Sequence, residues 1–439
     1  MSDKKILLIG SGAREHAIAK ALKQSKANIE LFCMASSLNP GIEKICSEII
    51  VENFNDIDKV IKYSKSKSIS LAIIGPENPL EVGLADSLWN EKIKVVGPKK
   101  KLARIETSKA FARDLLKKYN IPGCPNYQTF DSTLGVSSFL SEIGDHFVIK
   151  FDGLAGGKGV KVSGEHLANH TEALDYCKQI IGGGGLFVIE EKLIGEEFSL
   201  MSFCDGESLQ HMPAVQDHKR AHEGDTGPNT GGMGTYSDKN HSLPFLKKTD
   251  IQQAQNINVL VFEALKKEFC EGYKGILYGG FMATSEGVKV IEYNARFGDP
   301  EAMNVLSILE TDFFEICDAI SKGTLKKIDV KFQKKATVCK YAVPNGYPDS
   351  PIKGMPIYIN DNPTDLGEFF FASVDLKNNK LIQLGSRTVA AVGVGNSILE
   401  AEKIAENKIK NIDGPLFHRQ DIGTNKIIQK RIKHMNQLR

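Results

Sequence analysis

The chain has 439 residues, 41% of them hydrophobic and 25% charged, with a formal net charge of +2. This length predicts about three domains, and the near balance of charges argues against bulk attraction to nucleic acid or an anionic membrane. No apolar run approaches the ~18 residues of a membrane helix. The eight cysteines lack a C-x-x-C pair, which favours reduced thiols and a cytoplasmic protein over a disulfide or zinc framework.

Residues 1–98 alternate short apolar runs with helical patterns. Strands are expected in KILLIG (5–10), SLAIIGPE (70–77) and KVVGP (94–98), with helices in REHAIAKALKQS (14–25) and IDKVIKYSKSK (57–67). This βαβ rhythm predicts a parallel sheet.

The first strand ends in the glycine turn IGSGAREHA (9–17). A buried strand, a glycine turn and a helix start are typical of dinucleotide binding. However, Glu15 stands where the G-x-G-x-x-G fingerprint has its third glycine, and no acidic residue closes the second strand NIELFCMA. The exposed amides, the helix N-terminus and Arg14 instead favour a single phosphate.

The middle of the chain has a different rhythm. An amphipathic helix is expected over TSKAFARDLLKKYN (107–120), capped by Thr107 or Ser108. From residue 147, FVIKFDGLAGGKGVKVSG and LFVIEEKLIGEEFSLMSFCDGE each predict two strands around a turn. Because no helix separates these strands in the prediction, an antiparallel α+β region is expected. After residue 325, ATVCKYAVP, RTVAAVGVG and the helical SILEAEKIAENKIKN predict a third, β-rich unit.

The stretch GLAGGKGV (153–160) holds four glycines in eight residues. Glycines let backbone N–H groups turn towards phosphate oxygens, and Lys158 adds charge. It is not a P-loop, because Gly159 stands where Ser or Thr would be needed. A flexible surface hairpin is the alternative.

The strand GVKVIEYN (287–294) ends in hard oxygen donors. Glu292 and Asn294 are two residues apart and so share a face, a pair suited to Mg²⁺ bridging nucleotide phosphates. Arg296 follows on that face if the strand continues, and an arginine there can fork onto a carboxylate or phosphate. An ordinary polar strand end is the alternative.

The segment QDHKRAHEGDTGPNTGGMGTY (216–236) is polar over some twenty residues. Such a loop inside a large domain is usually functional or disordered. His218 and His222 are spaced for zinc only on a helix, which the glycines and Pro228 oppose.

Together these segments resemble the phosphoribosylamine–glycine ligases, or glycinamide ribonucleotide synthetases, of the ATP-grasp superfamily. The resemblance covers essentially the whole chain. It rests on GSGAREHA, IIGPENPL, SKAFARDLL, GLAGGKGV, IEEKLIGEEFS, QDHKRAHEGDTGPNTGGMGTY, IEYNARFGDPE and the terminal DIG (421–423).

The resemblance implies an ATP-dependent ligase that joins glycine to 5-phosphoribosylamine through a glycyl phosphate, giving glycinamide ribonucleotide, ADP and phosphate in purine synthesis. It implies an α/β and α+β multidomain fold. This has a Rossmann-like parallel sheet (1–106), an ATP-grasp body (107–325) with a mobile lid (about 124–195), and a C-terminal β-rich domain (326–439). Mg²⁺ or Mn²⁺ is the implied cofactor. We expect a monomer or weak homodimer, with no nucleic acid or membrane partner.

The resemblance also implies site residues. The metal ligands are Glu292 and Asn294, and the catalytic residues are Arg296, Asp217 and Lys219. The ATP-binding residues are Lys109, Lys150, Gly156, Gly157, Lys158, Glu190, Glu191, Leu193 and Glu197. The substrate-binding residues are Gly12, Arg14, Glu15, Asp225, Thr226, Gly227, Pro228, Asn229, Thr230, Gly231, Gly298, Asp299 and Pro300.

The sequence departs from the family pattern at ASSLNPGI (35–42), FASV (371–374) and GSRTV (385–389). These departures concern the substrate rim and C-terminal contacts. The alternatives are another ATP-grasp ligase or carboxylase such as a biotin carboxylase, a nicotinamide-dependent dehydrogenase, and a non-catalytic nucleotide sensor. The DTGPNTGGMG loop disfavours the first, Glu15 the second, and the presence of both Glu292 and Asn294 the third.

Overall fold

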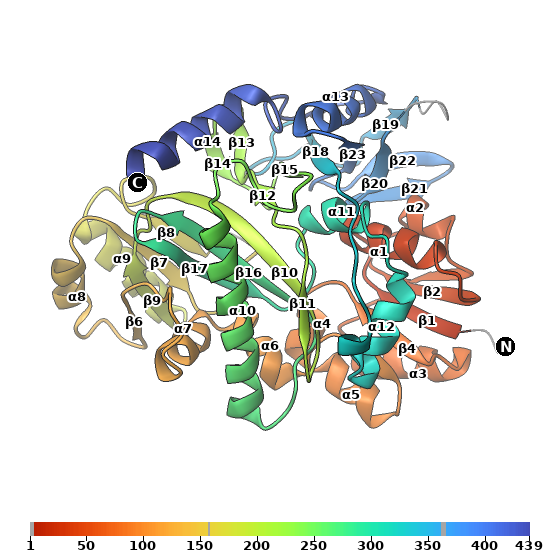
Figure 1. The fold of residues 1–439 in the computed structure, drawn as a ribbon, viewed down its shortest axis with the longest axis horizontal. Coiled ribbons are helices and arrows are strands. Elements are labelled where there is room, and N and C mark those ends of the chain that lie inside the picture. Colours follow the sequence, from red (N-terminus) through yellow and green to blue (C-terminus); the bar gives the residue numbers. More distant parts are fainter. Residues whose placement is uncertain (1–3, 157–158, 361–365) are drawn as a thin grey trace.

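The structure is a computed structural model that describes residues 4–156, 159–360 and 366–439. Figure 1 shows a central antiparallel sheet with the N-terminal sheet on one side and a small sheet on the other. The C-terminal elements lie along the top of the view, above the central sheet and the N-terminal sheet. Among the described residues, no helix combines the length and apolarity that crossing a bilayer requires.

The N-terminal sheet is parallel, with strand order β3-β2-β1-β4-β5. Its central strands read as continuous apolar runs because both faces are covered. The order reverses between β1 and β4, which opens a crevice at their carboxyl ends. The strands are β1 (Lys4–Ile9), β2 (Ile29–Ala35), β3 (Glu48–Val51), β4 (Leu71–Ile74) and β5 (Lys94–Val96), and the helices are α1 (Ala13–Lys23), α2 (Pro40–Glu43), α3 (Ile57–Lys67), α4 (Asn78–Val82) and α5 (Leu84–Asn90).

Two helices lead out of this sheet. α6 (Lys100–Thr107) ends where α7 (Lys109–Lys118) begins. Ser108 caps α7, since its Oγ accepts the Phe111 N–H at 3.0 Å. Of the two caps that the sequence offered, Ser108 is therefore the one used, and Thr107 closes the preceding helix.

A small antiparallel sheet follows, with strand order β6-β9-β7-β8 and its own apolar core. The sequence prediction missed the helix between β8 and β9, although the antiparallel pairing was predicted correctly. The elements are β6 (Tyr127–Phe130), α8 (Val136–Ile143), β7 (Phe147–Phe151), β8 (Val160–Val162), α9 (His170–Gly182) and β9 (Phe187–Glu191).

The central sheet has strand order β11-β10-β16-β17 and is antiparallel. The expected hairpin of β9 with β10 is wrong, because these strands belong to different sheets and residues 192–195 link them. One face of the central sheet is covered by α10 (Figure 1). The elements are β10 (Glu196–Asp205), β11 (Leu209–His211), α10 (Lys248–Phe269), β16 (Lys274–Thr284), β17 (Gly287–Asn294), α11 (Glu301–Leu306), α12 (Phe313–Lys322) and η1 (Leu325–Lys327).

The polar segment 216–236 contributes short strands to two sheets. β12 and β15 join the sheet β12-β15-β18-β23-β20, and β13 pairs with β14 as an isolated hairpin. These strands are β12 (Gln216–Asp217), β13 (Arg220–His222), β14 (Thr226–Asn229) and β15 (Gly234–Ser237). The C-terminal elements are β18 (Ala336–Pro344), β19 (Pro356–Ile359), β20 (Glu368–Phe371), β21 (Val374–Lys377), β22 (Lys380–Gln383), β23 (Val389–Gly395), α13 (Ile398–Ile409), β24 (Ile412–Asp413), β25 (Leu416–Phe417) and α14 (Asn425–Leu438).

The cap of α7 gives a stability prediction. The Ser108 hydroxyl also donates to Asp152 Oδ2 at 3.1 Å, so Ser108→Ala removes both the cap and this link. We expect a loss of roughly 1–2 kcal/mol in the free energy of unfolding, measured by urea denaturation. Thr107→Ala is the matched control and should be close to wild type. Equal losses in the two variants would contradict the assignment of the cap.

Candidate active site

β17 contains a β-bulge just before the predicted metal ligands. Val290 is buried and pairs with Phe281 of β16, while Glu292 pairs with the residue before Phe281, so the ladder skips Ile291. An uninterrupted strand would put Glu292 on the same face as Val290, because alternate residues share a face. The bulge shifts the alternation by one residue and turns Glu292 to the opposite face.

Tyr293 distinguishes the two faces of this strand end. Its hydroxyl donates to Asn258 Oδ1 of α10 at 3.0 Å, so Tyr293 points towards that helix. Glu292 and Asn294 flank Tyr293 and therefore point away from α10. The predicted pair of oxygen donors thus shares one face, and that face is the one opposite α10.

Two cations bind the carbonyl at the bulge. Arg113 Nη2 and Lys150 Nζ donate to Ile291 O at 2.7 and 2.9 Å. Both cations also pair with Glu190, and the Arg113 Nε–Glu190 Oε2 distance is 2.8 Å. Burial favours a higher pKa for Glu190, but the two cations outweigh it and the pKa is lowered. Lys150 and Glu190, predicted from separate motifs, therefore belong to one buried cluster.

Arg113 was not predicted as a site residue. It lies on α7, where a helical pattern marks it as one polar residue among several. Its side chain is only 3% exposed, which a single sequence does not reveal, because its partners Glu190 and Ile291 are distant in the chain.

Lys219 connects two carboxylates on the site face. Its Nζ lies 2.5 Å from Glu197 Oε1 and 3.8 Å from Glu292 Oε1. Burial acts to raise the pKa of Glu292, but Lys219 and Lys150 outweigh it and lower this pKa. Burial acts to lower the pKa of Lys219, and the carboxylates raise it. Glu292 is therefore held as a carboxylate, the form that a hard cation requires.

Asp217 lies beside another carboxyl group. Burial and the neighbouring charge of Glu301 raise the pKa of Asp217 well above its ordinary value. Burial also raises the pKa of Glu301, which accepts the Tyr278 hydroxyl at 2.8 Å. Glu301 was not predicted as a site residue, because in the sequence it only begins the helix after RFGDP.

The first turn of α7 is bonded to the start of the glycine stretch. Lys109 Nζ donates to Gly153 O at 2.7 Å, so this predicted phosphate ligand already lies against the loop. Gly156 has φ +54° and open space where a Cβ would be. Gly157 and Lys158 lie outside the described residues.

The end of β9 and the link to β10 contain two further predicted nucleotide ligands. Glu191 Oε1 accepts the Asn126 N–H at 2.9 Å, so its carboxylate fastens the residue just before β6. Leu193 is half-buried in the link itself. The link passes from the small sheet to the central sheet, so its backbone lies where the two meet.

Glu15 fills the glycine turn after β1. Its Oε2 accepts the Gly12 N–H at 2.5 Å, so this amide, expected to face a substrate phosphate, is bonded within the loop. A Cβ added to Gly12 or Gly75 would lie 2.8 or 2.1 Å from the Glu15 carboxylate oxygens. The side chain therefore occupies the space above the turn, which argues further against a dinucleotide there.

Arg14 bridges the carboxyl ends of β1 and β4. Its Nη1 donates to Gly75 O at 2.7 Å and lies 3.3 Å from Glu15 Oε1. Its Nε is buried and has no hydrogen-bond partner among the described residues. A buried unsatisfied donor is costly, and this one lies at the switch point of the parallel sheet, where ligands bind in such folds.

Arg296 does not continue the face of Glu292, because β17 ends at Asn294. Its guanidinium lies between two carboxylates: Arg296 Nε is 3.3 Å from Glu77 Oε2, and Arg296 Nη2 is 3.0 Å from Glu106 Oε1. Burial acts to lower the pKa of Arg296, and these carboxylates raise it. Arg296 thus joins the N-terminal sheet and α6 to the end of β17.

Arg387 joins the polar segment to the C-terminal unit. Its Nη1 donates to Gly231 O at 2.6 Å and to Asp299 O at 2.7 Å. Its guanidinium lies 4.8 Å from the ring centre of Tyr341, whose hydroxyl donates to Asp299 Oδ1 at 2.6 Å. Arg387 lies in the stretch 385–389 that departs from the family pattern, and its role was not predicted.

Three other predicted substrate residues lie next to the Gly231 and Asp299 contacts of Arg387, or close to them in the chain. The Thr230 N–H and Oγ1 both donate to Lys219 O, at 2.7 and 2.9 Å. The Gly298 N–H donates to Met201 Sδ at 3.4 Å. Pro300 is buried and precedes the first residue of α11.

Asp225 is held by the C-terminal end of the chain. Arg419 Nη2 lies 3.1 Å from Asp225 Oδ1, and Arg431 Nη2 lies 2.9 Å from Oδ2. Asp421, in the DIG motif, accepts the neighbouring Gly224 N–H at 2.8 Å. Asp225, predicted to bind substrate, is therefore fully engaged in protein contacts, and its partners were not predicted.

The four residues after Asp225 form the strand β14 on an exposed hairpin. Thr226, Gly227, Pro228 and Asn229 pair with β13 and are largely accessible. Arg220 of β13 contacts Glu165 beside the small sheet. These predicted substrate residues are thus not among the described contacts of Glu292.

Three family models match successive parts of this chain. They are the phosphoribosylglycinamide synthetase N domain at residues 4–106, its ATP-grasp (A) domain at 107–302 and its C domain at 337–425. The chain belongs to the phosphoribosylglycinamide synthetase family. This confirms the resemblance drawn from the sequence.

Relatives and solved structures agree with this family. A phosphoribosylamine–glycine ligase from Methanosarcina acetivorans is 51% identical over 437 residues, covering 99% of this chain and 98% of that protein. One from Methanocaldococcus jannaschii is 50% identical over 444 residues, covering 99% and 100%. The Thermotoga maritima ligase structure has a TM-score of 0.81 at 28% identity, covering 95% and 99%. The predicted multidomain fold class is confirmed.

A carboxylase structure shares the fold alone. The biotin carboxylase domain of Hydrogenobacter thermophilus 2-oxoglutarate carboxylase, solved with MgADP, has a TM-score of 0.70 at 15% identity. It covers 99% of this chain and 94% of that one.

The Glu77–Arg296 contact gives a pH prediction. Burial opposes the charge of Glu77, but Arg296 and Arg14 outweigh it and lower the pKa to about 2, from 4.5. Ionised Glu77 therefore stabilises the fold above pH 4.5, and this contribution is lost as the pH falls towards 2. Between pH 7 and pH 3 it accounts for about 2 kcal/mol.

Glu77→Gln should remove this part of the acid sensitivity. We expect the loss of stability between pH 7 and pH 3, measured by urea denaturation, to be smaller than in wild type. Glu81→Gln, at an exposed glutamate of α4, is the matched control. An unchanged pH dependence in Glu77→Gln would show that its charge does not stabilise the fold.

Proposed function

We propose that this chain is an ATP-dependent ligase that joins glycine to 5-phosphoribosylamine, giving glycinamide ribonucleotide, ADP and phosphate. One observation carries the proposal beyond the family relationship. Lys150 Nζ donates to Ile291 O at 2.9 Å, next to Glu292, and Arg296 Nε, four residues further on, lies 3.3 Å from Glu77 Oε2 after β4. A continuous set of charged groups thus runs from the glycine stretch to the switch point of the N-terminal sheet.

This arrangement suits a reaction among ATP, a carboxylate and a phosphorylated amine. The glycine carboxylate attacks the γ-phosphorus in line, the bond to the bridging oxygen breaks, and ADP leaves. The amine nitrogen of phosphoribosylamine then attacks the acyl carbon, phosphate leaves with the C–O electrons, and the nitrogen loses a proton. A carboxylate alone is a poor acyl donor, so ATP supplies the leaving group. The protein mainly positions groups and neutralises charge.

In this proposal, one set of residues binds the nucleotide, another binds the ribosylamine, and others adjust charge or cover the site. Lys109 and Lys150 face the ATP phosphates, and residues 190–197, from the end of β9 to the start of β10, meet adenine and ribose. Lys219 offsets carboxylate charge on the site face, and Asp217 lies two residues from it. Arg14, on the other side, binds the phosphate of the ribosylamine. Arg387 holds the 217–232 segment, which closes over the acyl phosphate and limits hydrolysis.

Glu292 and Asn294 fit a divalent metal. ATP-grasp enzymes generally require one with ATP, and the carboxylase with the same fold was solved with MgADP. One carboxylate and one amide oxygen on a single strand face are suitable donors, because Mg²⁺ takes its other ligands from phosphate oxygens and waters. When bound, the metal neutralises phosphate charge. Mg²⁺ or Mn²⁺ both satisfy this donor set.

The roles of the domains, the cellular location and the oligomeric state stay predictions. The N-terminal domain (1–106) would bind the ribosylamine and the ATP-grasp body (107–325) the nucleotide, with the small sheet as its lid. The C-terminal domain (326–439) would hold the polar segment. We also propose a cytoplasmic monomer or weak homodimer.

Release of ADP with substrates omitted one at a time tests the proposal. Purified protein is given ATP, glycine and freshly generated phosphoribosylamine, and ADP is measured. We expect stoichiometric ADP only with all three. Turnover with bicarbonate replacing glycine would instead favour the carboxylase alternative, and ADP formation independent of both acceptor substrates would refute the ligase.

Arg14→Ala tests the ribosylamine side. A charged hydrogen bond contributes roughly 1.5–3 kcal/mol, so the apparent KM for phosphoribosylamine should rise about tenfold to a hundredfold. The KM for ATP should stay near wild type, because the nucleotide binds elsewhere. Lys23→Ala, at the exposed end of α1, is the control. A selective rise in the KM for ATP would overturn the assignment.

Glu292→Gln tests the metal clamp. It keeps the shape and removes the charge, so kcat should fall by orders of magnitude while the thermal transition stays close to wild type. Steady-state ADP formation is measured at saturating ATP across a range of Mg²⁺. Glu286→Gln, on the exposed turn before β17, is the matched control. Wild-type kcat and metal dependence in Glu292→Gln would place the clamp elsewhere.

A further inference from the structure

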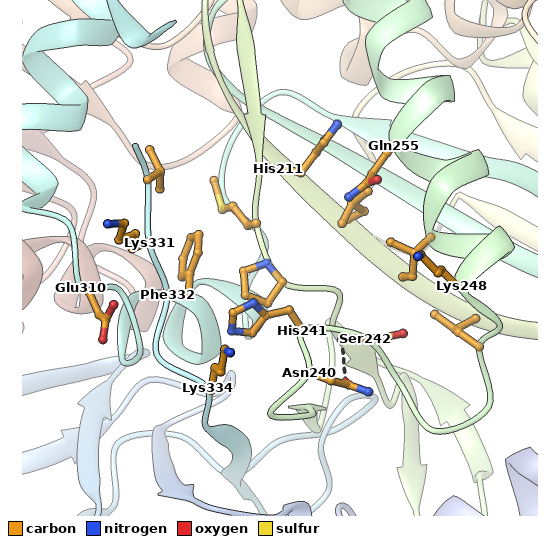
Figure 2. A pocket seen from close by; sticks show the side chains of 16 residues that line it. His211, Asn240, His241, Ser242, Lys248, Gln255, Glu310, Lys331, Phe332 and Lys334 are labelled. Carbon is orange, nitrogen blue, oxygen red and sulfur yellow. Dashed lines mark hydrogen bonds between the residues drawn. The ribbon is translucent and has the colours of Figure 1, made fainter. Parts of the chain in front are cut away.

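A cavity lies on the α10 side of the central sheet. Its volume is about 1020 Å³, it is open to solvent, and it is bordered by β10, β11, the segments 240–246 and 330–334 and the start of α10 (Figure 2). Leu200 of β10 lines it, and Asn258 of α10 donates to Leu200 O at 3.0 Å. Because Glu292 faces away from α10, this cavity and the candidate active site lie on opposite faces of one sheet.

The cavity walls combine apolar surface with amide groups. Met212, Leu246 and Phe332 supply apolar surface, and the His241 ring lies 6.1 Å from the Phe332 ring, edge to face. Gln255 projects from α10 on the opposite wall (Figure 2). The walls thus mix apolar surface, which can cover a ligand's ring, with polar groups that can fix its orientation.

The rim of the cavity is basic. Lys248, Lys331 and Lys334 line it against a single acidic residue, Glu310. Lys331 pairs with Asp329 at 3.2 Å. Among the described residues, the ammonium groups of Lys248 and Lys334 have no hydrogen-bond or ion-pair partner. These two cations come from different walls, α10 and the segment before β18, and border the same space (Figure 2).

We propose that this cavity binds a nucleoside phosphate, separately from the ATP site. The apolar walls suit the faces of a heterocyclic ring, and the Gln255 amide suits a ring edge. The unpaired lysines at the rim suit a phosphate, for which lysine is a compact point charge. The volume is at the upper end of that of small-molecule cavities, so a whole nucleotide fits and a phosphate ion alone leaves the apolar walls uncovered.

A chain of hydrogen bonds, buried except at His211, connects this cavity to the strand end of the active site. His211, in the cavity wall, bonds Ser202 at 2.9 Å, and Asn258 Nδ2 donates to Ser202 Oγ at 3.2 Å. The Tyr293 hydroxyl donates to Asn258 at 3.0 Å. Tyr293 lies between the two proposed metal ligands, so a nucleotide in the cavity is coupled to ATP binding. This coupling rests on the proposed function, whereas binding in the cavity does not.

Photo-crosslinking with 8-azidoadenosine 5′-monophosphate tests the binding. Labelled peptides of the full chain are identified by mass spectrometry. We expect label on peptides from 240–255 or 328–335 in addition to any at the ATP site. Lys248→Glu should lose only the label in the cavity. Lys247→Glu makes the same charge change on the adjacent exposed residue, which does not line the cavity, and should keep it.

The labelling result decides the binding without any catalytic assay. Absence of label from the cavity peptides in wild type would overturn the proposal. Equal loss in Lys247→Glu and Lys248→Glu would show only general attraction to a basic surface and would also overturn it. Ile251→Trp, which fills the cavity from its α10 wall, should abolish the same label and provides an independent variant.

Adenosine monophosphate effects on ATP kinetics test the coupling. Adenosine monophosphate also competes with ATP at the ATP site, and this effect on the KM for ATP is the same in wild type and in the variants. Any part of the change in KM that is present in wild type and absent in Lys248→Glu therefore comes from binding in the cavity. We expect that part to be at least about fivefold, a typical coupling between sites. Ser202→Ala should keep the crosslink and lose this part. Identical responses of wild type and Lys248→Glu, or an undiminished effect in Ser202→Ala, would refute the coupling through this chain.

Discussion

Pairing of buried opposite charges holds the three parts of the chain together around residues 292–300. A buried ion without a partner costs several kcal/mol. Arg296 finds its partners in Glu77 after β4 and Glu106 of α6, and Asp299 finds them in Arg387 and Tyr341 of the C-terminal unit. The segment is satisfied only when the N-terminal sheet and the C-terminal unit are both docked. The site is therefore built by the assembly of the whole chain rather than by one domain.

This constraint also explains where the chemistry is placed. The end of β17 carries the oxygen donors on one face, and the residues that follow it reach the N-terminal crevice. In the proposed reaction, an acyl phosphate formed on the nucleotide side would therefore be close to the amine side, and the same bonded network would fix both. This proposed placement would limit hydrolysis, which the reaction needs because water competes with the amine.

Much of this was predictable from the sequence, and the exceptions have physical causes. Apolar runs gave the parallel sheet, and the spacing of Glu292 and Asn294 gave their common face. The sequence does not show the bulge at Ile291, without which both would face α10. Strand periodicity does not reveal sheet partners, so β9 and β10 were mistaken for a hairpin. Arg113 and Arg387 escaped because their partners are distant in the chain, and no local pattern marks a buried arginine.

The central claim is that glycine is activated as an acyl phosphate before the amine attacks it. Isotope transfer tests it most directly. Glycine labelled with ¹⁸O in both carboxylate oxygens is turned over with ATP and phosphoribosylamine, and the products are examined by mass spectrometry. The account predicts one ¹⁸O in each released phosphate and the other in the amide carbonyl of glycinamide ribonucleotide. Phosphate without ¹⁸O would contradict it.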